Sequence, residues 1–185
     1  MVFDYCPRCR EKLTTNPDGY RACGCGFVHY DNPTPVVAIV VPMMHLFLDF
    51  MKTDTSGILD GGLVLVRRGQ PPFVGKWCLP CGHIEQFGHP KAEGARETHE
   101  ECGLTVRMEK LLCICNPMPV EINQIVISYL ARPVGGILRA GDDASAVGVF
   151  TPENRPDICF RSHRMLFDRW FEGSLGTLTG NDLVI

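Results

Sequence analysis

The chain has 185 residues, of which 45% are hydrophobic and 21% are charged, and its formal net charge is −3. This length and apolar share suit one ordinary domain with a small extra module, and they exclude an intrinsically disordered chain. The near-neutral charge argues against sequence-independent binding to nucleic acid or to anionic lipid. We expect no membrane partner, because the most apolar stretch, Val36 to Phe50, is broken by Pro42 and His45 and is shorter than a bilayer requires.

The first residues contain no basic segment followed by an apolar run, so we expect no secretory signal and a cytoplasmic location. Cysteine usage supports this expectation. Four of the ten cysteines lie within the first 25 residues, and the other six are scattered. A secreted disulfide scaffold would space them as a framework along the chain, whereas this pattern predicts one metal-type cluster and several buried thiols in a reducing compartment.

The N-terminal cluster consists of Cys6, Cys9, Cys23 and Cys25. Four thiolates brought together predict a structural zinc ion, which stabilises a segment too small to bury a core of its own. The second pair is one residue closer than the usual spacing, so the alternative is two thiol pairs without metal. Asp31-Asn32-Pro33 is typical of a boundary. We therefore expect a zinc ribbon over residues 1–33 and a larger domain over 34–185.

The larger domain begins with strand-like runs. We expect strands at Val36–Val41, Leu63–Val66 and Gln124–Leu130, because each is rich in aliphatic or β-branched residues. Residues 45–61 form an insert of ambiguous structure. We expect one helix from Pro90 to the cap residue Gly103 and another over Ser162–Glu172, with Ser162 as its N-cap. Strands interrupted by two helices predict a mixed α/β (α+β) domain.

The first of these helices is crowded with carboxylates. Glu93, Glu97, Glu100 and Glu101 fall on one face, and such like charges repel by roughly 0.2–0.5 kcal/mol per pair. A divalent cation with oxygen ligands, Mg²⁺ or Mn²⁺, would remove this penalty. The alternative is a solvent-exposed glutamate-rich face. We expect the opposite face to pack against the sheet through Ala92, Ala95, His99 and Cys102.

The same segment resembles the Nudix box. The residues in register with its pattern are Gly82, Arg96, Glu97, Glu100, Glu101, Gly103 and Leu104. Three flanking stretches are also similar to the family: Gly75–Gly82, Val66–Gly69 and Phe160–Arg164. The resemblance spans about Pro35 to Trp170 and implies an α/β/α sandwich with a mixed sheet. It also implies metal-dependent cleavage of the pyrophosphate bond in a nucleoside diphosphate derivative.

Four positions depart from the family pattern: Cys81 and Phe87 replace glycines, Gly88 replaces the first glutamate, and Thr98 replaces an apolar residue. In the family the missing glutamate pairs with the box arginine, so we expect Arg96 to lose its partner and metal binding or turnover to weaken. Glu85, in the preceding loop, is the nearest replacement. This departure motivates an alternative function, a regulatory Nudix domain that binds an ADP-containing ligand without turnover.

The resemblance implies roles for individual residues. The expected Mg²⁺ or Mn²⁺ ligands are Glu85, Glu97, Glu100 and Glu101, and the expected catalytic residues are the last three with Asp143, for which Asp142 is an alternative. Arg67 and Arg68 are expected to bind substrate phosphates, and Gly82, Arg96 and Gly103 to support the structure. Trp77, His163, Cys113 and Cys115 are expected to be packing residues.

The N-terminal cysteines make the chain similar to Nudix hydrolases that carry a zinc ribbon and cleave ADP-ribose, FAD or NADH. The motif of the NADH-preferring members is absent, which favours ADP-ribose-like or flavin dinucleotides. The ribbon has few basic residues, so nucleic acid is a less favoured partner for it. A homodimer is the default expectation for this family.

Overall fold

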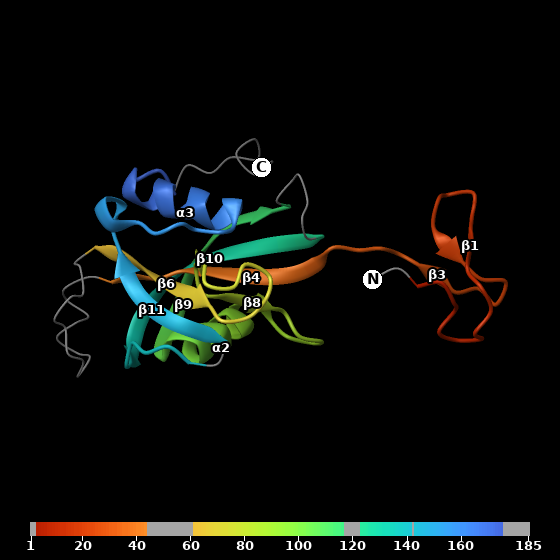
Figure 1. Ribbon diagram of the computed structural model, residues 1–185, viewed down its shortest axis with the longest axis horizontal. Coiled ribbons are helices and arrows are strands. Elements are labelled where there is room, and N and C mark those ends of the chain that lie inside the picture. Colours follow the sequence, from red (N-terminus) through yellow and green to blue (C-terminus); the bar gives the residue numbers. More distant parts are fainter. Residues whose placement is uncertain (1–2, 44–60, 117–122, 142, 176–185) are drawn as a thin grey trace. The chain divides into compact units, whose positions relative to one another are not determined.

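The computed structural model describes residues 3–43, 61–116, 123–141 and 143–175. Residues 45–60 of the predicted insert lie outside the described residues. The chain divides into two compact units, Met1–Pro33 and Thr34–Ile185, each of which has its own internal contacts. Both are drawn in Figure 1.

The N-terminal unit is a small antiparallel sheet with strand order β1-β2-β3, formed by Thr14–Thr15, Arg21–Ala22 and Val28–His29. The turn between β1 and β2 contains Asn16, Pro17, Asp18 and Gly19, residue types that are common in turns. Asn16 Oδ1 accepts a hydrogen bond from the Tyr20 backbone N–H at 2.8 Å, and the Gly19 N–H donates to the Asn16 carbonyl at 3.0 Å. Such short strands bury little apolar surface, so this unit needs another source of stability.

The second unit contains two sheets. One has the order β8-β4-β10-β9 and is mixed, because β4 and β10 run parallel while the other pairs are antiparallel. The other has the order β11-β6-β5, and β7 also pairs with β6. The strands are β4 (Thr34–Val40), β5 (Pro42–Met43), β6 (Gly62–Arg68), β7 (Trp77–Cys78), β8 (Cys81–His83), β9 (Leu104–Cys115), β10 (Gln124–Gly136) and β11 (Ala144–Phe150).

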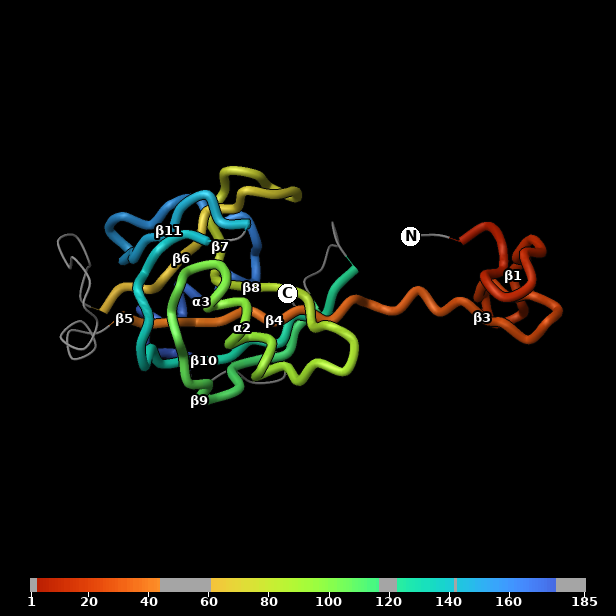
Figure 2. Tube along the Cα trace, turned by 90° about the horizontal axis from the view of Figure 1, so that it is seen from below, coloured from red at the N-terminus to blue at the C-terminus, as the bar shows by residue number. Residues whose placement is uncertain are grey.

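Two helices, α2 (Pro90–Cys102) and α3 (Arg161–Phe171), lie on opposite sides of these strands, as Figures 1 and 2 show; a short 3₁₀ helix, η1 (Pro152–Asn154), precedes α3. The alternation of side chains along β4 explains this arrangement. Val37 and Ile39 belong to the core cluster that includes Cys102 of α2, whereas Ala38 and Val40 belong to the cluster that includes Phe167 of α3. The expected helix–sheet–helix architecture of the α+β class is confirmed.

The predicted elements are present with shifted ends. The three predicted strands correspond to β4, β6 and β10, and β10 continues six residues beyond the predicted end because it pairs with the long strand β9. Helix α2 begins at Pro90 and ends at Gly103, which adopts the left-handed conformation with φ of 72°. The N-cap prediction for α3 was wrong. Phe160 is the N-cap, and Ser162 lies inside the helix and is buried.

The predicted packing face of α2 is confirmed at Cys102, which is buried, and at Ala95, which packs against the core, but not at the other two residues. Gly94, Thr98 and Cys102 are buried, whereas Ala92 and His99 are exposed. Thr98 is tolerated in the core because its hydroxyl donates to the Gly94 carbonyl at 2.7 Å, which satisfies the polar group inside the helix. The face of α2 that packs against the sheet is therefore rotated relative to the predicted face.

Gly94 is the point of closest approach between α2 and the sheet. A Cβ at this position would lie 2.5 Å from Ile39 Cδ1 and 3.2 Å from both Val37 Cγ2 and Met108 Cε. We expect Gly94→Val to lower the free energy of unfolding by about 1–3 kcal/mol through overpacking, measured by urea denaturation. The control Ala92→Val, on the exposed side of the same helix, should change it by less than about 0.5 kcal/mol. Equal effects would contradict this packing.

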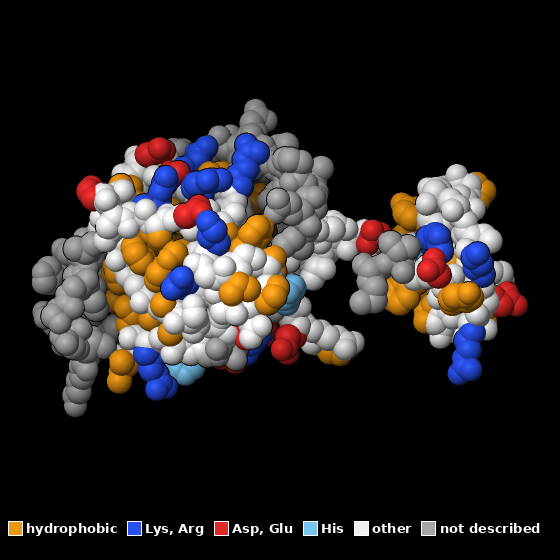
Figure 3. Space-filling view, in the orientation of Figure 1, with side chains coloured by type: hydrophobic (Ala, Val, Ile, Leu, Met, Phe, Trp, Pro, Cys, Tyr) orange, Lys and Arg blue, Asp and Glu red, His pale blue; other side chains and the backbone are white. Residues whose placement is uncertain are grey.

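Among the described residues, none of the helices is long and apolar enough to cross a bilayer. On the face shown in Figure 3, basic side chains over α3 are mixed with acidic ones, and hydrophobic side chains lie between them. The charge distribution on this face thus matches the near-neutral composition.

Candidate active site

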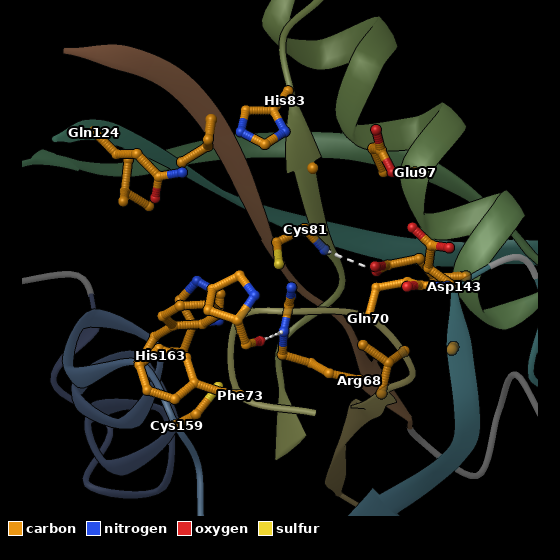
Figure 4. A pocket seen from close by; sticks show the side chains of 18 of the residues that line it. Arg68, Gln70, Phe73, Cys81, His83, Glu97, Gln124, Asp143, Cys159 and His163 are labelled. Carbon is orange, nitrogen blue, oxygen red and sulfur yellow. Dashed lines mark hydrogen bonds between the residues drawn. The ribbon is translucent and has the colours of Figure 1, made fainter. Parts of the chain in front are cut away.

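A cavity of about 600 Å³ opens between α2 and β8 on one side and the loop after β6 and the start of α3 on the other (Figure 4). Its lining has two chemically different ends. One end carries carboxylates on or near α2, and the other carries basic and aromatic side chains. The acidic lining residues are Glu85, Glu97, Glu100, Glu101 and Asp143, and the residues at the other end include Arg68, Phe73, Phe160, His163 and Arg164.

Glu101 is the most buried of these carboxylates, with 8% of its surface exposed. Its Oε2 accepts a hydrogen bond from the Cys81 backbone N–H at 2.9 Å, which fixes the side chain against β8 (Figure 4). Burial raises the pKa of Glu101 to about 8 although this hydrogen bond acts in the opposite direction. Burial also raises the pKa of Glu97. A bound divalent cation would favour the charged form of both groups, so this donor set fits Mg²⁺ or Mn²⁺.

Gly82 makes room for the Glu97 carboxylate. A Cβ at position 82 would lie 2.0–2.5 Å from the carboxylate atoms of Glu97, so a larger residue would displace this carboxylate. Glycine therefore permits the observed position of Glu97 where β8 passes α2. The structural role expected for Gly82 is therefore to let the Glu97 carboxylate lie close to the backbone of β8.

Arg96 connects the carboxylates. Its guanidinium donates to Glu93 Oε2 at 2.8 Å, to Glu97 Oε1 at 2.7 Å and to Glu100 Oε2 at 2.5 Å, and it lies 3.8 Å from Glu85 Oε1. The hydrogen bond to Glu93, followed by the nearby carboxylates, raises the pKa of Arg96. Arg96 thus offsets part of the repulsion along the helix. The expectation that a cation alone relieves this repulsion was incomplete.

The expectation that Arg96 lacks a partner was wrong, and Glu93 provides the reason. A Cβ at Gly88 would lie 2.9 Å from three atoms of the Glu93 carboxyl group, so the Glu93 side chain occupies the space next to position 88. The carboxylate that the family pattern places at position 88 is thus supplied from the first turn of α2. Phe87, the other departure in this loop, is almost fully exposed and has a φ of 66°, a conformation that favours glycine.

The remaining predicted residues are divided between the cavity and its surroundings. Asp143 and Glu85 line the cavity, whereas Asp142 lies outside the described residues. Arg68 lines it and donates to the Pro72 carbonyl at 2.6 Å, but Arg67 does not line it and donates to the Gly75 carbonyl at 2.8 Å. The substrate-binding role expected for Arg67 therefore has no support from its position.

Gly103 supports the end of α2 and lies outside the cavity lining. Its backbone is left-handed, its N–H donates to the His99 carbonyl at 2.9 Å, and a Cβ there would lie 2.3 Å from the Ile137 carbonyl oxygen. These features explain why the helix ends here and β9 begins at the next residue.

Several lining residues were not predicted as site residues. Phe73 and Phe160 pack edge to face at 5.5 Å, and Arg68 lies over the Phe160 ring at 5.4 Å. His163 is buried, as expected for a packing residue, yet it also lines the cavity, and burial lowers its pKa to about 3. In the sequence, only the similarity of Phe160–Arg164 to the family pointed to this end of the cavity. That similarity did not indicate which side chains line the cavity.

The expected packing residues lie in the core. Trp77 packs edge to face on Phe150 at 4.7 Å, and Cys113 and Cys115 are both buried on one side of β9. These contacts agree with the packing roles predicted for the three side chains.

In the N-terminal unit, the four predicted cysteines converge. The Cys6 and Cys25 sulfurs are 3.6 Å apart, the Cys9 and Cys23 sulfurs are 3.2 Å apart, and all four lie within 4.8 Å of one another. The shortened second pair does not prevent this arrangement. Four thiols at these separations suit a tetrahedral zinc ion.

Comparison with known proteins adds a family assignment. A family model described as NUDIX domain matches residues 54–167. An ADP-ribose pyrophosphatase of Methanocaldococcus jannaschii is 31% identical over 118 residues, which are 62% of this chain and 70% of that protein. A NUDIX hydrolase structure from Nitrosomonas europaea superposes with a TM-score of 0.72 at 24% identity, covering 92% of both chains. An ADP-ribose pyrophosphatase structure from Streptococcus suis superposes with a TM-score of 0.59 at 18% identity, covering 77% of this chain and 92% of that one.

Proposed function

Because the chain belongs to the NUDIX family and is a Nudix pyrophosphohydrolase, we propose that it cleaves the pyrophosphate bond of an ADP-ribose-like or FAD-like dinucleotide with Mg²⁺ or Mn²⁺ as cofactor. The observation that carries this proposal is the pairing of a group of carboxylates, of which Glu101 is buried, with a basic, aromatic wall in one cavity. The carboxylates suit a divalent cation, and the other wall suits phosphates and a base. The related archaeal ADP-ribose pyrophosphatase supports the substrate class.

In this proposal Glu97 and Glu101 hold the metal, with Glu85 and Glu100 as further candidate ligands. Bound Mg²⁺ would neutralise the diphosphate oxygens and make the attacking water more acidic. Arg96 holds the helix carboxylates in a fixed arrangement, and Cys81 orients Glu101 through its backbone N–H.

On the opposite wall, Arg68 offers positive charge to the substrate phosphates, and Phe73 and Phe160 offer apolar surface to the base or ribose. Glu100 or Asp143 would accept the proton of the attacking water. Asp143 is exposed and opposes ionisation of the buried Glu101, so the two carboxylates face the same region.

The regulatory alternative loses its motive in this structure. It rested on Gly88 and the resulting loss of a partner for Arg96, but Glu93 supplies that partner at 2.8 Å. We therefore favour hydrolysis over the regulatory alternative. For the N-terminal unit we propose a structural zinc ion at Cys6, Cys9, Cys23 and Cys25, supported by their convergence.

The direct test is incubation of the protein with ADP-ribose, FAD and NADH, each with Mg²⁺ or Mn²⁺, followed by chromatographic detection of AMP. We expect AMP from ADP-ribose or FAD, and no AMP when a chelator replaces the metal. Omission of enzyme gives the background rate. Absence of AMP from ADP-ribose and from FAD with either metal would overturn the proposed substrate class.

A further inference from the structure

A second group of metal-type ligands lies in the wall of the cavity, far along the chain from the N-terminal cluster. Cys78 ends β7 and Cys81 begins β8, and their sulfurs are 4.0 Å apart. The ligand atoms of Cys78, Cys81 and His163 all lie within 4.8 Å of one another. Around a tetrahedral zinc ion with Zn–S bonds of about 2.3 Å, two sulfurs are about 3.8 Å apart. The Cys78–Cys81 pair is thus already close to the separation that zinc requires.

His163 is oriented as a ligand. It comes from α3, and its Nδ1 accepts a hydrogen bond from the Leu79 N–H at 3.2 Å, inside the loop between the two cysteines. The lone pair of Nδ1 therefore points into the loop, where a zinc ion would take the place of the Leu79 N–H, and the proton of the neutral ring is on Nε2. The side chain is 3% exposed, so its orientation is fixed by packing.

Cys159 and Arg68 also line the cavity near this group. Two thiolates, a neutral imidazole and a divalent zinc ion have no net charge, and three protein ligands leave the fourth position of a tetrahedral ion open.

We propose that Cys78, Cys81 and His163 bind a zinc ion in the wall of the catalytic cavity, separate from the N-terminal zinc and from the carboxylate-bound Mg²⁺. Such an ion would link the β7–β8 loop to the start of α3. Because the Cys81 N–H donates to Glu101, the ion would also fix the orientation of a proposed Mg²⁺ ligand. Cys81 lies at a position where the Nudix pattern has glycine. The proposed zinc ligand is therefore a residue at which the chain departs from its family.

A redox-active dithiol is the competing interpretation of two cysteines with this spacing. Catalytic dithiols of that kind lie at helix N-termini, where the thiolate is stabilised. Here the pair lies between two short strands, and a histidine faces it. The geometry therefore favours metal binding over disulfide exchange.

The test is elemental analysis of the full chain purified under reducing conditions without chelator. We expect two zinc ions per chain in the wild-type protein and one in Cys81→Gly, which restores the family residue and keeps the backbone N–H. Cys9→Ser should also lose one zinc, from the N-terminal cluster. The matched control is Cys113→Ser, a buried thiol beside Ser128, which should retain two.

Zinc content in Cys81→Gly equal to that of the wild-type protein would overturn the inference, as would a peptide map that shows a Cys78–Cys81 disulfide. If Cys81→Gly fails to fold, Cys78→Ser tests the same site, with the same loss expected. The same measurement tests the N-terminal zinc separately. If the wild-type protein holds one zinc ion and Cys81→Gly holds none, the zinc ribbon is contradicted and the cavity site is not.

Discussion

Replacement of Glu101 by glutamine is expected to abolish metal-dependent hydrolysis while the fold is retained. Glutamine has nearly the same shape, and its carbonyl oxygen can still accept the hydrogen bond from the Cys81 N–H. What is lost is the negative charge at the buried end of the cavity. Removal of a residue that only orients a metal ligand costs about 10–100-fold in metal affinity or activity. Removal of the charge of the ligand itself should cost more, so we expect kcat to fall by at least about 100-fold. The measurement is the rate of AMP release at saturating Mg²⁺.

The same substitution should raise the thermal stability of the metal-free protein at pH 8 and above. The pKa of Glu101 is raised to about 8 in the folded state, above its ordinary value of 4.5, so the wild-type protein loses stability as pH rises between these values. Glutamine removes this loss because it does not ionise. Added Mg²⁺ should raise the melting temperature of the wild-type protein more than that of the variant.

Glu153→Gln is the matched control, because Glu153 is exposed in η1 and does not line the cavity. It should leave both the rate and the response to Mg²⁺ unchanged. Wild-type activity in Glu101→Gln would reject the assignment of Glu101 as a metal ligand, whatever its effect on stability.

The main elements of the fold could be predicted because their signals are local. A run of β-branched residues gave β4, and Pro90 with Gly103 marked the ends of α2. The carboxylates of the cavity followed from helix periodicity and from the family pattern. The burial of Glu101 could not be predicted in this way, since it depends on β8 packing against α2.

The errors arose where contacts between distant segments decide the outcome. The packing face of α2 was predicted correctly at Ala95 and Cys102 but not at Ala92 and His99, which are exposed. Thr98 is buried instead and satisfies its hydroxyl within the helix. The cavity-facing role of His163 was missed because 84 residues separate it from its partner Leu79. The loss of a partner for Arg96 was predicted from position 88, with Glu85 as the nearest replacement, whereas Glu93, one helical turn before Arg96, is the partner in the structure.

Glu93→Ala is expected to lower kcat about 10–100-fold, the usual cost of removing a group that orients metal ligands. Glu93 holds two guanidinium nitrogens of Arg96, and without it Arg96 would be held only by Glu97, Glu100 and the more distant Glu85. Those contacts would then restrain the proposed ligands less well. The loss should appear as a higher Mg²⁺ requirement and a lower kcat, measured by titrating Mg²⁺ at saturating substrate.

The decisive variant is the exchange of the two positions. Gly88→Glu alone should also lower activity, because its side chain would collide with the Glu93 carboxyl group and add a like charge. In the Glu93→Ala background the same change should restore activity, because the space is then vacant and the new carboxylate can reach Arg96. The backbone permits this, since Gly88 is not among the residues with positive φ. A purely structural role for Glu93 predicts that the two losses add. A double variant less active than Glu93→Ala would therefore contradict the replacement of the family glutamate by Glu93.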